Sequence, residues 1–331
     1  MTVAQSRLLK THPRRQRTSR LSVTVLAGGP GCERDVSLQS GQAVYQALRR
    51  LGHEASLCDI RPDELKALDL AADFVFIALH GEFGEDGTLQ AELDARDIRY
   101  SGTGARASRL AMNKAESKRC FQQAGIPTPR FEVANPRNVA GLESRFPVPA
   151  VLKPVALGSS VDIRIVRYPK ELHEAASALI EKYGEVLVEQ YIAGPELTVG
   201  ILGNRALPVC EIRTKREFYD YQAKYIDNDT QYLFDLDLPA VLLERVQALS
   251  LRAHRCLGCR VFSRVDWKVD AQSNEPFILE VNTIPGFTDH SLLPKAAART
   301  GMSFDKLCQT IIDLSLQDDS PSGSSTYRSP H

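Results

Sequence analysis

Two strand-like segments near the carboxyl end of the chain carry side chains that could hold a metal ion. Residues 261–270 (VFSRVDWKVD) and 277–286 (FILEVNTIPG) show the period-two alternation of strands with two different faces. The stretch between them, AQSNEP, is typical of a turn, so the two segments predict an antiparallel hairpin. If Asp270 pairs with Pro276, two pairs of residues lie opposite each other: Asp266 with Glu280, and Arg264 with Asn282.

In this register Asp266, Glu280 and Asn282 would bring two carboxylates and an amide oxygen together. Carboxylates that lie so close repel each other unless a cation lies among them. Because the set contains no His or Cys, it suits a hard ion such as Mg²⁺ better than zinc. The alternative is a solvated polar face on an edge hairpin, and the hairpin alone favours neither interpretation.

Polar residues also follow the strands that we expect at the amino end. A buried-type strand at 21–27 ends in a glycine-rich turn, after which come Glu33 and Arg34, and His80 ends a later strand. In an open α/β domain these residues would lie at the carboxyl edge of the sheet, where such domains bind ligands. The turn lacks a GxGxxG fingerprint and is weak evidence of a dinucleotide site. Taken alone, Glu33 is better explained as an acid favoured at a helix N-terminus.

A third candidate site follows a strand at 146–154 that ends in Lys153. The loop VALGSS and the strand VDIRIV come next, so Gly158, Ser159 and Ser160 lie at a hairpin tip. Backbone N–H groups and hydroxyls there could bind a phosphate. A hairpin turn needs Gly and Ser for its own geometry, however, and without further context that explanation is the better one.

The elements that must position these residues divide the chain. Strands alternating with helices predict a parallel α/β domain that ends near Gly102. Residues 104–125 form one helical pattern, and strands and a helix follow as far as residue 212. Residues 213–238 have little periodicity and many Tyr, Lys and Asp, which is typical of a functional loop or lid. A helix at 238–258, the hairpin and two closing helices complete the pattern.

Composition limits the partners and the compartment. Lys plus Arg equals Asp plus Glu at 41 each, so no global charge favours nucleic acid or a membrane surface. The seven scattered cysteines fit a reducing compartment, and no run approaches the roughly 18 apolar residues of a membrane span. We therefore expect a cytoplasmic protein. The basic residues 1–20 lack a secretory signal, and both they and the Ser- and Pro-rich residues 319–331 are expected to be disordered tails.

Eight motifs follow one another in a specific order: GGxxxERDVS, ALHGxxGEDG, MNKxxSK, LKPxxxGSS, VEQYIxGPELTVG, FYDYQAKY, SRVD and LEVNTIPGFTxHSLLP. In this combination the chain resembles D-alanine–D-alanine ligases of the ATP-grasp superfamily, over about residues 23–316. The resemblance implies a three-domain α/β fold. Its parts are an N-terminal parallel α/β domain on the first-substrate side (21–102), a central α+β ATP-grasp domain (103–192) and a C-terminal antiparallel α+β catalytic domain (193–318).

The same resemblance implies an activity. The enzyme would use ATP to join two D-alanines through an acyl phosphate, for peptidoglycan precursors, with Mg²⁺ or Mn²⁺, two ions in all. A homodimer is what the family suggests, with no nucleic-acid or membrane partner. Two alternatives stay open: a ligase of different amino-acid specificity in a specialised pathway, and a nucleotide-binding paralogue that has lost turnover.

Site residues follow by matching motifs. The matched ATP-binding positions are Lys114, Lys153, Ser159, Ser160, Glu189, Ile192, Glu196 and Lys224. The lysines and the GSS loop would contact phosphates, Glu189 the adenine amino group, the backbone near Ile192 the adenine edge and Glu196 the ribose. The matched metal ligands are Asp266, Glu280 and Asn282, the three residues of the hairpin.

The resemblance also assigns substrate and catalytic roles. Glu33 would hold the ammonium of the first D-alanine, with His80 near its carboxylate. Arg264 and the Gly286 backbone would stabilise the tetrahedral oxyanion. The carboxylate of the second D-alanine would bind Ser291 and the backbone of Leu292. Ser159 and Tyr225 match a hydrogen-bonded pair that links the lid to Glu33.

The chain departs from the family pattern at a few positions. Pro30, Gly31 and Cys32 stand where Thr-Ser-Ala commonly follows the double glycine, and Asp35 replaces a common Glu. Asn113 replaces the usual Asp before Lys114, and Asp162 stands after GSSV where Gly is frequent. An acid at 162 could weaken nucleotide binding by repulsion or could point to solvent. All residues matched to metal, phosphate and oxyanion roles remain, so we expect an active enzyme.

Overall fold

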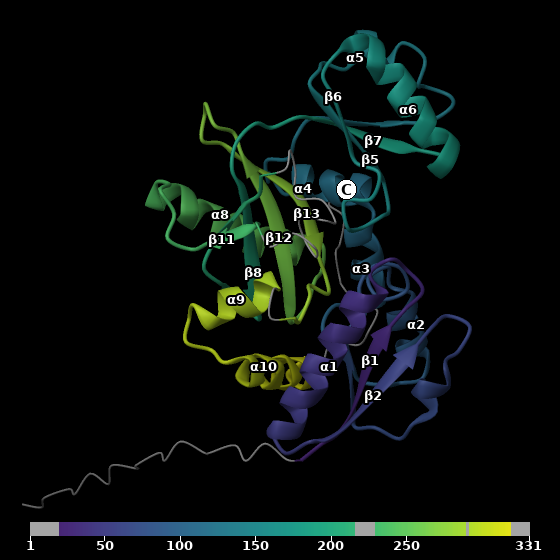
Figure 1. The fold of residues 1–331 in the computed structure, drawn as a ribbon, viewed down its shortest axis with the longest axis vertical. Helices are drawn as coiled ribbons and strands as arrows, with labels where there is room; N and C mark the ends of the chain where they lie inside the picture. Colours follow the sequence, from purple (N-terminus) through teal and green to yellow (C-terminus); the bar gives the residue numbers. More distant parts are fainter. Residues whose placement is uncertain (1–19, 216–228, 289–290, 319–331) are drawn as a thin grey trace, which may run out of the picture.

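Three β-sheets follow one another along the long axis of the molecule (Figure 1). The computed structural model describes residues 20–215, 229–288 and 291–318. Within these residues, the parallel sheet comes first in the chain, and the two antiparallel sheets follow it. No helix in the described ranges is both long enough and apolar enough to cross a membrane.

The N-terminal sheet has the strand order β2-β1-β3, and both pairings are parallel. The strands are β1 (Ser22–Gly28), β2 (Glu54–Ile60) and β3 (Phe74–Ile77), and the helices are α1 (Arg34–Arg50), the 3₁₀ helix η1 (Lys66–Asp69) and α2 (Thr88–Ala95). β1, the central strand, and β3 beside it are apolar and buried, as expected for parallel strands that are covered on both faces. The turn after β1 leads directly into α1, which places Glu33 at the N-terminus of that helix.

The central sheet has four antiparallel strands in the order β4-β7-β5-β6. Its elements are β4 (Phe131–Ala134), α5 (Leu142–Arg145), β5 (Ala150–Pro154), β6 (Arg164–Val166), α6 (Pro169–Tyr183) and β7 (Val186–Gln190). Helix α6 packs on one face of the sheet through Leu172, Ala176 and Leu179, which belong to the same apolar cluster as Leu152. Val151, Lys153 and Glu189 of this sheet line a pocket together with residues of the β5–β6 loop.

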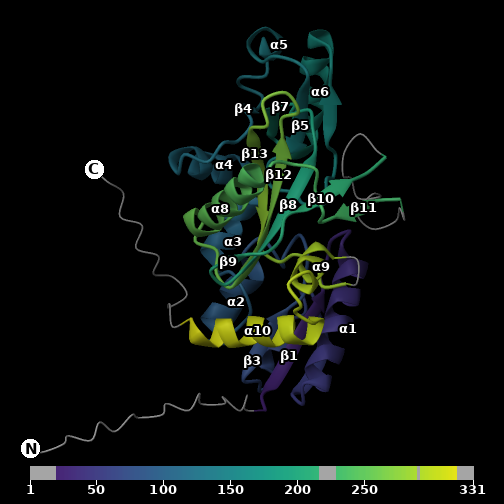
Figure 2. The same ribbon diagram turned by 90° about the vertical axis from the view of Figure 1, so that its left-hand side faces the viewer.

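The C-terminal sheet runs β11-β10-β8-β12-β13, with β9 paired to β8. Its strands are β8 (Glu196–Leu202), β9 (Arg205–Ala206), β10 (Cys210–Arg213), β11 (Gln231–Leu233), β12 (Phe262–Val269) and β13 (Pro276–Asn282). The helices are α8 (Ala240–Cys256), α9 (Leu292–Ala298) and α10 (Phe304–Gln317). α10 lies beside α1 (Figure 2), and its buried face belongs to the same apolar cluster as β1 and β3.

The 104–125 segment is two helices, and our expectation of a single helical pattern is wrong. Helix α3 (Ala105–Met112) ends at Asn113, and α4 (Lys114–Gln123) begins there. The Asn113 side chain caps the new helix by accepting a hydrogen bond from the Glu116 N–H at 3.0 Å. α4 contacts both β13 and the central sheet, so its lysines lie between the two antiparallel sheets.

The β12–β13 hairpin has a register that differs from our expectation at the turn. Pro276 pairs with Val269 and not with Asp270, because Asp270 belongs to the turn. Its N–H donates to the Glu275 carbonyl at 3.0 Å, and its Oδ1 accepts the Ser273 N–H at 2.8 Å. The expected pairing was therefore wrong by one residue at this end.

A bulge restores the expected register further along the hairpin. The pairing shifts by one residue between Asp266 and Trp267, and beyond it the pairs are Asp266 with Glu280 and Arg264 with Asn282, as expected. The alternate face of β12 is apolar: Val265, Trp267 and Val269 are buried in the cluster that includes α8. This burial turns Arg264, Asp266 and Lys268 towards the opposite face of the sheet.

Candidate active site

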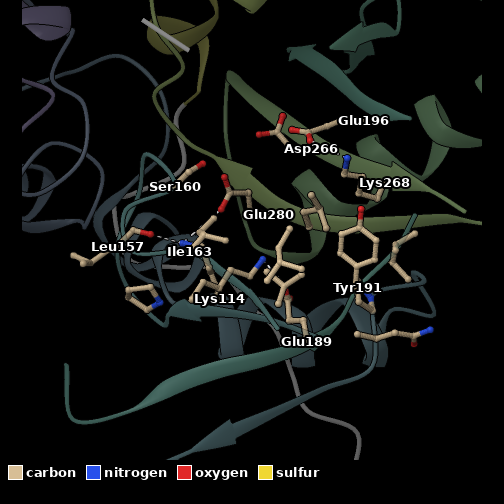
Figure 3. A pocket seen from close by; sticks show the side chains of 18 of the residues that line it. Lys114, Leu157, Ser160, Ile163, Glu189, Tyr191, Glu196, Asp266, Lys268 and Glu280 are labelled. Atoms are coloured by element: carbon tan, nitrogen blue, oxygen red, sulfur yellow. Dashed lines mark hydrogen bonds and ion pairs between the residues drawn. The ribbon is translucent and has the colours of Figure 1, made fainter. Parts of the chain in front are cut away.

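A pocket opens between the central and C-terminal sheets. It holds about 950 Å³ of empty space, its open mouth included. Figure 3 shows Asp266 and Glu196 on one side, Lys114 and Glu189 on the other, and Glu280 between them. Apolar side chains of the two sheets and of the β5–β6 loop complete the wall: Val151, Leu157, Val161, Ile163, Ile165, Ile192 and Leu279. The combination of apolar walls with several charged groups suits a nucleotide.

Two buried lysines hold Glu189 on the floor of this pocket. The Lys118 ammonium lies 2.5 Å from Glu189 Oε1, and Lys153 pairs with Oε2. Burial alone would raise the pKa of Glu189, but the two cations outweigh it, and this pKa lies below its ordinary value. Burial lowers the pKa of Lys118 to about 8 against the opposing effect of Glu189. Glu189 is therefore ionised and fixed.

Lys114 connects the pocket to the loop between β5 and β6. Its ammonium donates to the Leu157 carbonyl at 2.5 Å and lies 3.5 Å from Glu280 Oε2. Burial lowers the pKa of Lys114, an effect that Glu280 opposes. Lys114 thus contacts both the β5–β6 loop and the β12–β13 hairpin.

Asp266 is the centre of the polar face of the hairpin. Its carboxylate accepts hydrogen bonds from Thr198 Oγ1 at 2.6 Å and from Asn282 Nδ2 at 2.9 Å. Arg264 binds it in a bidentate manner, through Nε at 2.9 Å and Nη2 at 2.7 Å. Glu280 lies directly opposite on β13, so the three oxygen-bearing residues that we expected to converge do so.

This donor set fits a hard divalent cation. It offers two carboxylates and one amide, with neither nitrogen nor sulfur ligands. In the described part of the chain, no cluster of three or more His, Cys, Asp and Glu residues could hold a metal ion. A site here would therefore use the Asn282 amide as its third protein ligand.

The β5–β6 loop carries Ser159 and Ser160, both in the left-handed backbone region, with φ of 54° and 57°. Ser160 lines the pocket. The Ser159 hydroxyl is buried and has no hydrogen-bond partner among the described residues. A buried hydroxyl without a partner is costly, so this group suits a ligand or a lid residue.

Glu33 and His80 lie at the carboxyl edge of the N-terminal sheet, both buried. His80 donates from Nδ1 to the Ile284 carbonyl at 3.0 Å, and its Nε2 is 2.9 Å from Ser40 Oγ. Burial lowers the pKa of His80, so the ring is neutral and its tautomer is set by the carbonyl. This hydrogen bond joins the N-terminal sheet to the segment that follows β13.

The loop and Glu33 approach each other closely. A Cβ placed on Gly158 would lie 3.5 Å from Glu33 Oε2, and one on Gly81, whose φ is +70°, would lie 2.6 Å from the same atom. Gly81 thus has to be glycine both for its backbone angle and for space. The segment after β3 and the β5–β6 loop therefore both lie close to the Glu33 carboxylate.

Gly286, Ser291 and Leu292 follow the hairpin. A Cβ on Gly286 would lie 2.5 Å from Ser291 Oγ, which also accepts the Thr288 N–H at 2.9 Å. Ser291 precedes α9, and Leu292 is buried in a small cluster with Cys210 and Ile212. Lys224 and Tyr225, which we expected in the lid, lie outside the described residues.

Three residues at or beside the site were not among those expected from the sequence. Lys118 lies one helical turn after Lys114, and this i, i+4 spacing was the signal that could have found it. Lys268 shares the polar face of β12 with Asp266 and lies 3.2 Å from Glu196. Burial, and next the Glu33 charge, raise the pKa of Glu85 to about 8, so this acid is protonated at neutral pH. Nothing in the sequence pattern singled it out.

The chain is similar to known proteins over most of its length. A family model described as "D-ala D-ala ligase C-terminus" matches residues 120–313, and one described as "D-ala D-ala ligase N-terminus" matches residues 61–103. A D-alanine–D-alanine ligase from Bordetella avium is 44% identical over 88% of this chain and 93% of its own. One from Halalkalibacterium halodurans is 40% identical over 90% and 100%. A crystal structure of the Bacillus anthracis ligase complexed with ATP superposes with a TM-score of 0.76 at 34% identity, over 90% of this chain and 98% of that one.

Proposed function

The chain belongs to the D-alanine–D-alanine ligase family and is an ATP-dependent enzyme that joins two D-alanines for peptidoglycan precursors; from this premise we propose how its residues divide the work. One observation carries the proposal: Lys114 and Lys153 line the same pocket as Asp266 and Glu280. Phosphoryl transfer requires cations that hold phosphates and carboxylates that hold metal ions. The pocket contains both kinds of group, the lysines and the carboxylates.

ATP lies in this pocket with its base between the two antiparallel sheets. Ile192 offers its backbone to the adenine edge, Glu189 accepts from the adenine amino group, and Glu196 accepts from the ribose. The burial of Glu189 between two lysines supports this role, because a fixed carboxylate selects an amino group over a carbonyl. The residues that bind the phosphates are Lys114, Lys153, Ser159, Ser160 and, from the lid, Lys224.

Asp266, Glu280 and Asn282 would hold Mg²⁺ or Mn²⁺, two ions in all. Bound there, the metal would supply positive charge beside the transferred phosphate. Because Arg264 and Asn282 donate to Asp266, this carboxylate is oriented before any cation binds. The all-oxygen donor set supports a hard ion.

The first step joins the carboxylate of one D-alanine to the γ-phosphate of ATP and releases ADP. Glu33 pairs with the ammonium of this D-alanine, and the neutral His80 lies near its carboxylate. Ser159 and Tyr225 link the lid to Glu33 by hydrogen bonds. The short separation between Gly158 and Glu33 supports this link, since it brings the loop to the substrate ammonium.

In the second step the amine of another D-alanine attacks the acyl carbon, and phosphate leaves. Arg264 and the Gly286 N–H stabilise the oxyanion that forms, in the manner of preorganised donors. Ser291 and the Leu292 N–H bind the carboxylate of the second D-alanine. The contact of Ser291 with the Gly286 position supports a shared site for these two groups.

We also propose that the enzyme acts in the cytoplasm, as a homodimer, with no nucleic-acid or membrane partner. The balance of 41 basic and 41 acidic residues supports the absence of a polyanionic partner. Sedimentation of the purified protein tests the dimer, and a concentration-independent monomer would contradict it.

The activity is tested with purified protein, ATP and Mg²⁺, by scanning D- and L-amino acids for ADP release and identifying each product by mass. We expect the best turnover with D-alanine and D-alanyl-D-alanine as the product. Preference for another amino acid would show a different specificity. ATP binding without ADP release would show an inactive paralogue, and either result would overturn the proposal.

A further inference from the structure

Asp162 closes the phosphate-type loop in a backbone conformation that favours glycine. Its φ is +53°, and it follows Ser159 and Ser160, whose φ angles are also positive. Aspartate adopts this region more readily than most residues, but it is still less favourable there than glycine. A side chain at this position therefore needs compensation from its contacts.

The side chain of Asp162 makes those contacts with the end of α6. The Lys182 ammonium donates to its Oδ2 at 2.6 Å, and the Tyr183 hydroxyl donates to the same oxygen. The Lys182 ammonium also lies 5.0 Å from the centre of the Tyr183 ring. Three residues thus form one cluster, which we name the loop latch: Asp162, Lys182 and Tyr183.

The latch turns the acidic charge of Asp162 away from ATP. Val161 and Ile163 line the pocket, whereas Asp162 between them does not. The two hydrogen-bond donors hold the pKa of Asp162 below its ordinary value, so the carboxylate stays ionised and paired. The positive charge of Lys182 therefore offsets most of the repulsion that Asp162 could exert on the phosphates of ATP.

The loop is fixed at both of its ends. Lys114 holds the Leu157 carbonyl before the serines, and the latch holds Asp162 after them. Ser159 and Ser160 lie in the short segment between these two anchors. Preorganised donors bind a ligand more tightly because less conformational entropy is lost on binding.

We propose that Asp162 is a positioning residue for ATP: through Lys182 and Tyr183 it fixes the β5–β6 loop so that Ser159 and Ser160 face the triphosphate. This inference rests on the proposed role of the loop in phosphate binding. The residue acts through the serines and does not itself touch the nucleotide.

The test measures KM for ATP and kcat for Asp162→Ala, Asp162→Asn and Tyr183→Phe, with Lys170→Met as the control on the exposed start of α6. We expect Asp162→Ala to raise KM for ATP about fivefold with kcat changed less than about twofold, since a partly exposed charged hydrogen-bond pair is modest in strength. Asp162→Asn keeps a hydrogen-bond acceptor and tolerates positive φ, so its KM for ATP should lie closer to the wild-type value than that of Asp162→Ala. Lys170→Met should match the wild type.

Two further variants separate the latch from its alternatives. Asp162→Gly fits the backbone but has no side chain, so under the proposal it resembles Asp162→Ala; wild-type KM in Asp162→Gly would overturn it. The double variant Lys182→Met, Asp162→Ala should raise KM for ATP no more than Asp162→Ala alone does, because both substitutions remove the same Lys182–Asp162 contact. Fully additive effects would also overturn the proposal. Thermal unfolding of each variant excludes loss of fold as the cause.

Ser160→Ala separates two statements: that the β5–β6 loop binds ATP, and that the loop latch positions this loop. If Ser160→Ala and Asp162→Ala both raise KM for ATP, the loop binds phosphate and the latch positions it. If only Ser160→Ala does so, the latch fails while the proposed function stands. If neither changes KM, the loop itself has no role in ATP binding, and both statements fail.

Discussion

At the scale of single residues, Glu280 is the most exacting test of the metal proposal. Glu280→Gln keeps the shape of the side chain but removes one of the two facing carboxylates. We expect turnover to fall by about 10²-fold or more without unfolding, since electrostatic groups of this kind contribute on that scale. ADP release at saturating ATP and Mg²⁺ measures the effect. Glu275→Gln, the same change at the hairpin turn, where Glu275 pairs with Arg245 outside the pocket, is the control. Near-normal activity of Glu280→Gln would contradict the assignment.

Lys118 is the buried residue that motif matching overlooked. In its absence Lys153 alone would neutralise the buried Glu189 carboxylate, so the existing ion pair of Lys153 with Oε2 would compete more strongly with the phosphates. Lys118→Gln should therefore raise KM for ATP about tenfold, with a smaller change in kcat. The neighbouring Arg119→Gln alters an exposed charge on the same helix and should match the wild type. If Lys118→Gln and Arg119→Gln have the same KM for ATP, Lys153 alone is sufficient to hold Glu189 in place.

At the scale of elements, the break between α3 and α4 positions both Lys114 and Lys118. Asn113→Ala removes the N-cap of α4 and should destabilise the protein by about 1 kcal/mol in urea unfolding. Asn113→Asp keeps an acceptor at the same place and adds a charge that the helix N-terminus favours, so it should unfold at or above the wild-type urea concentration. If both variants lose the same stability, the side chain does not act as a cap.

Local patterns predicted most elements well because strand and helix periodicity depends on neighbouring residues. The hairpin of Asp266 and Glu280 is an example: alternation predicted two facing strands with these side chains on one face, and the structure pairs the two residues. Two details could not be predicted from the sequence pattern. The capping of α4 required a side chain to fold back on its own backbone, and the bulge beside Trp267 compensated a turn that takes in Asp270. Both depend on contacts that periodicity does not encode.

At the scale of the whole molecule, acid stability should depend on His254. This buried side chain on α8 is hydrogen-bonded through Nδ1 to Ser263 Oγ at 2.7 Å, and burial lowers its pKa to about 4. The unfolded chain, with an ordinary histidine pKa of 6.5, binds the proton more readily in the interval between the two values. Stability is therefore lost as pH falls from about 6.5 towards 4, by about 3 kcal/mol from this residue.

The single tryptophan reports this loss, because Trp267 is buried against α8 and donates to Ser250 Oγ at 2.9 Å. His254→Gln removes the titration, so unfolding followed by tryptophan emission should vary less with pH than in the wild type. The comparison is between slopes, which separates His254 from the carboxylates that both proteins share. Parallel pH profiles would assign the acid sensitivity to other groups.

The sequence by itself determined which chemistry the chain can perform. The order of its motifs, the oxygen-bearing hairpin and the lysine and GSS segments follow from residue types and short spacings, which folding does not alter. Only the tertiary structure decided how these groups act on one another. It paired Glu189 with Lys118 and Lys153, brought Gly158 beside Glu33 and tied Asp162 to the end of α6. These contacts join elements that are separated along the chain, and only the packing of three sheets selects them from the many pairs that the charges alone would allow.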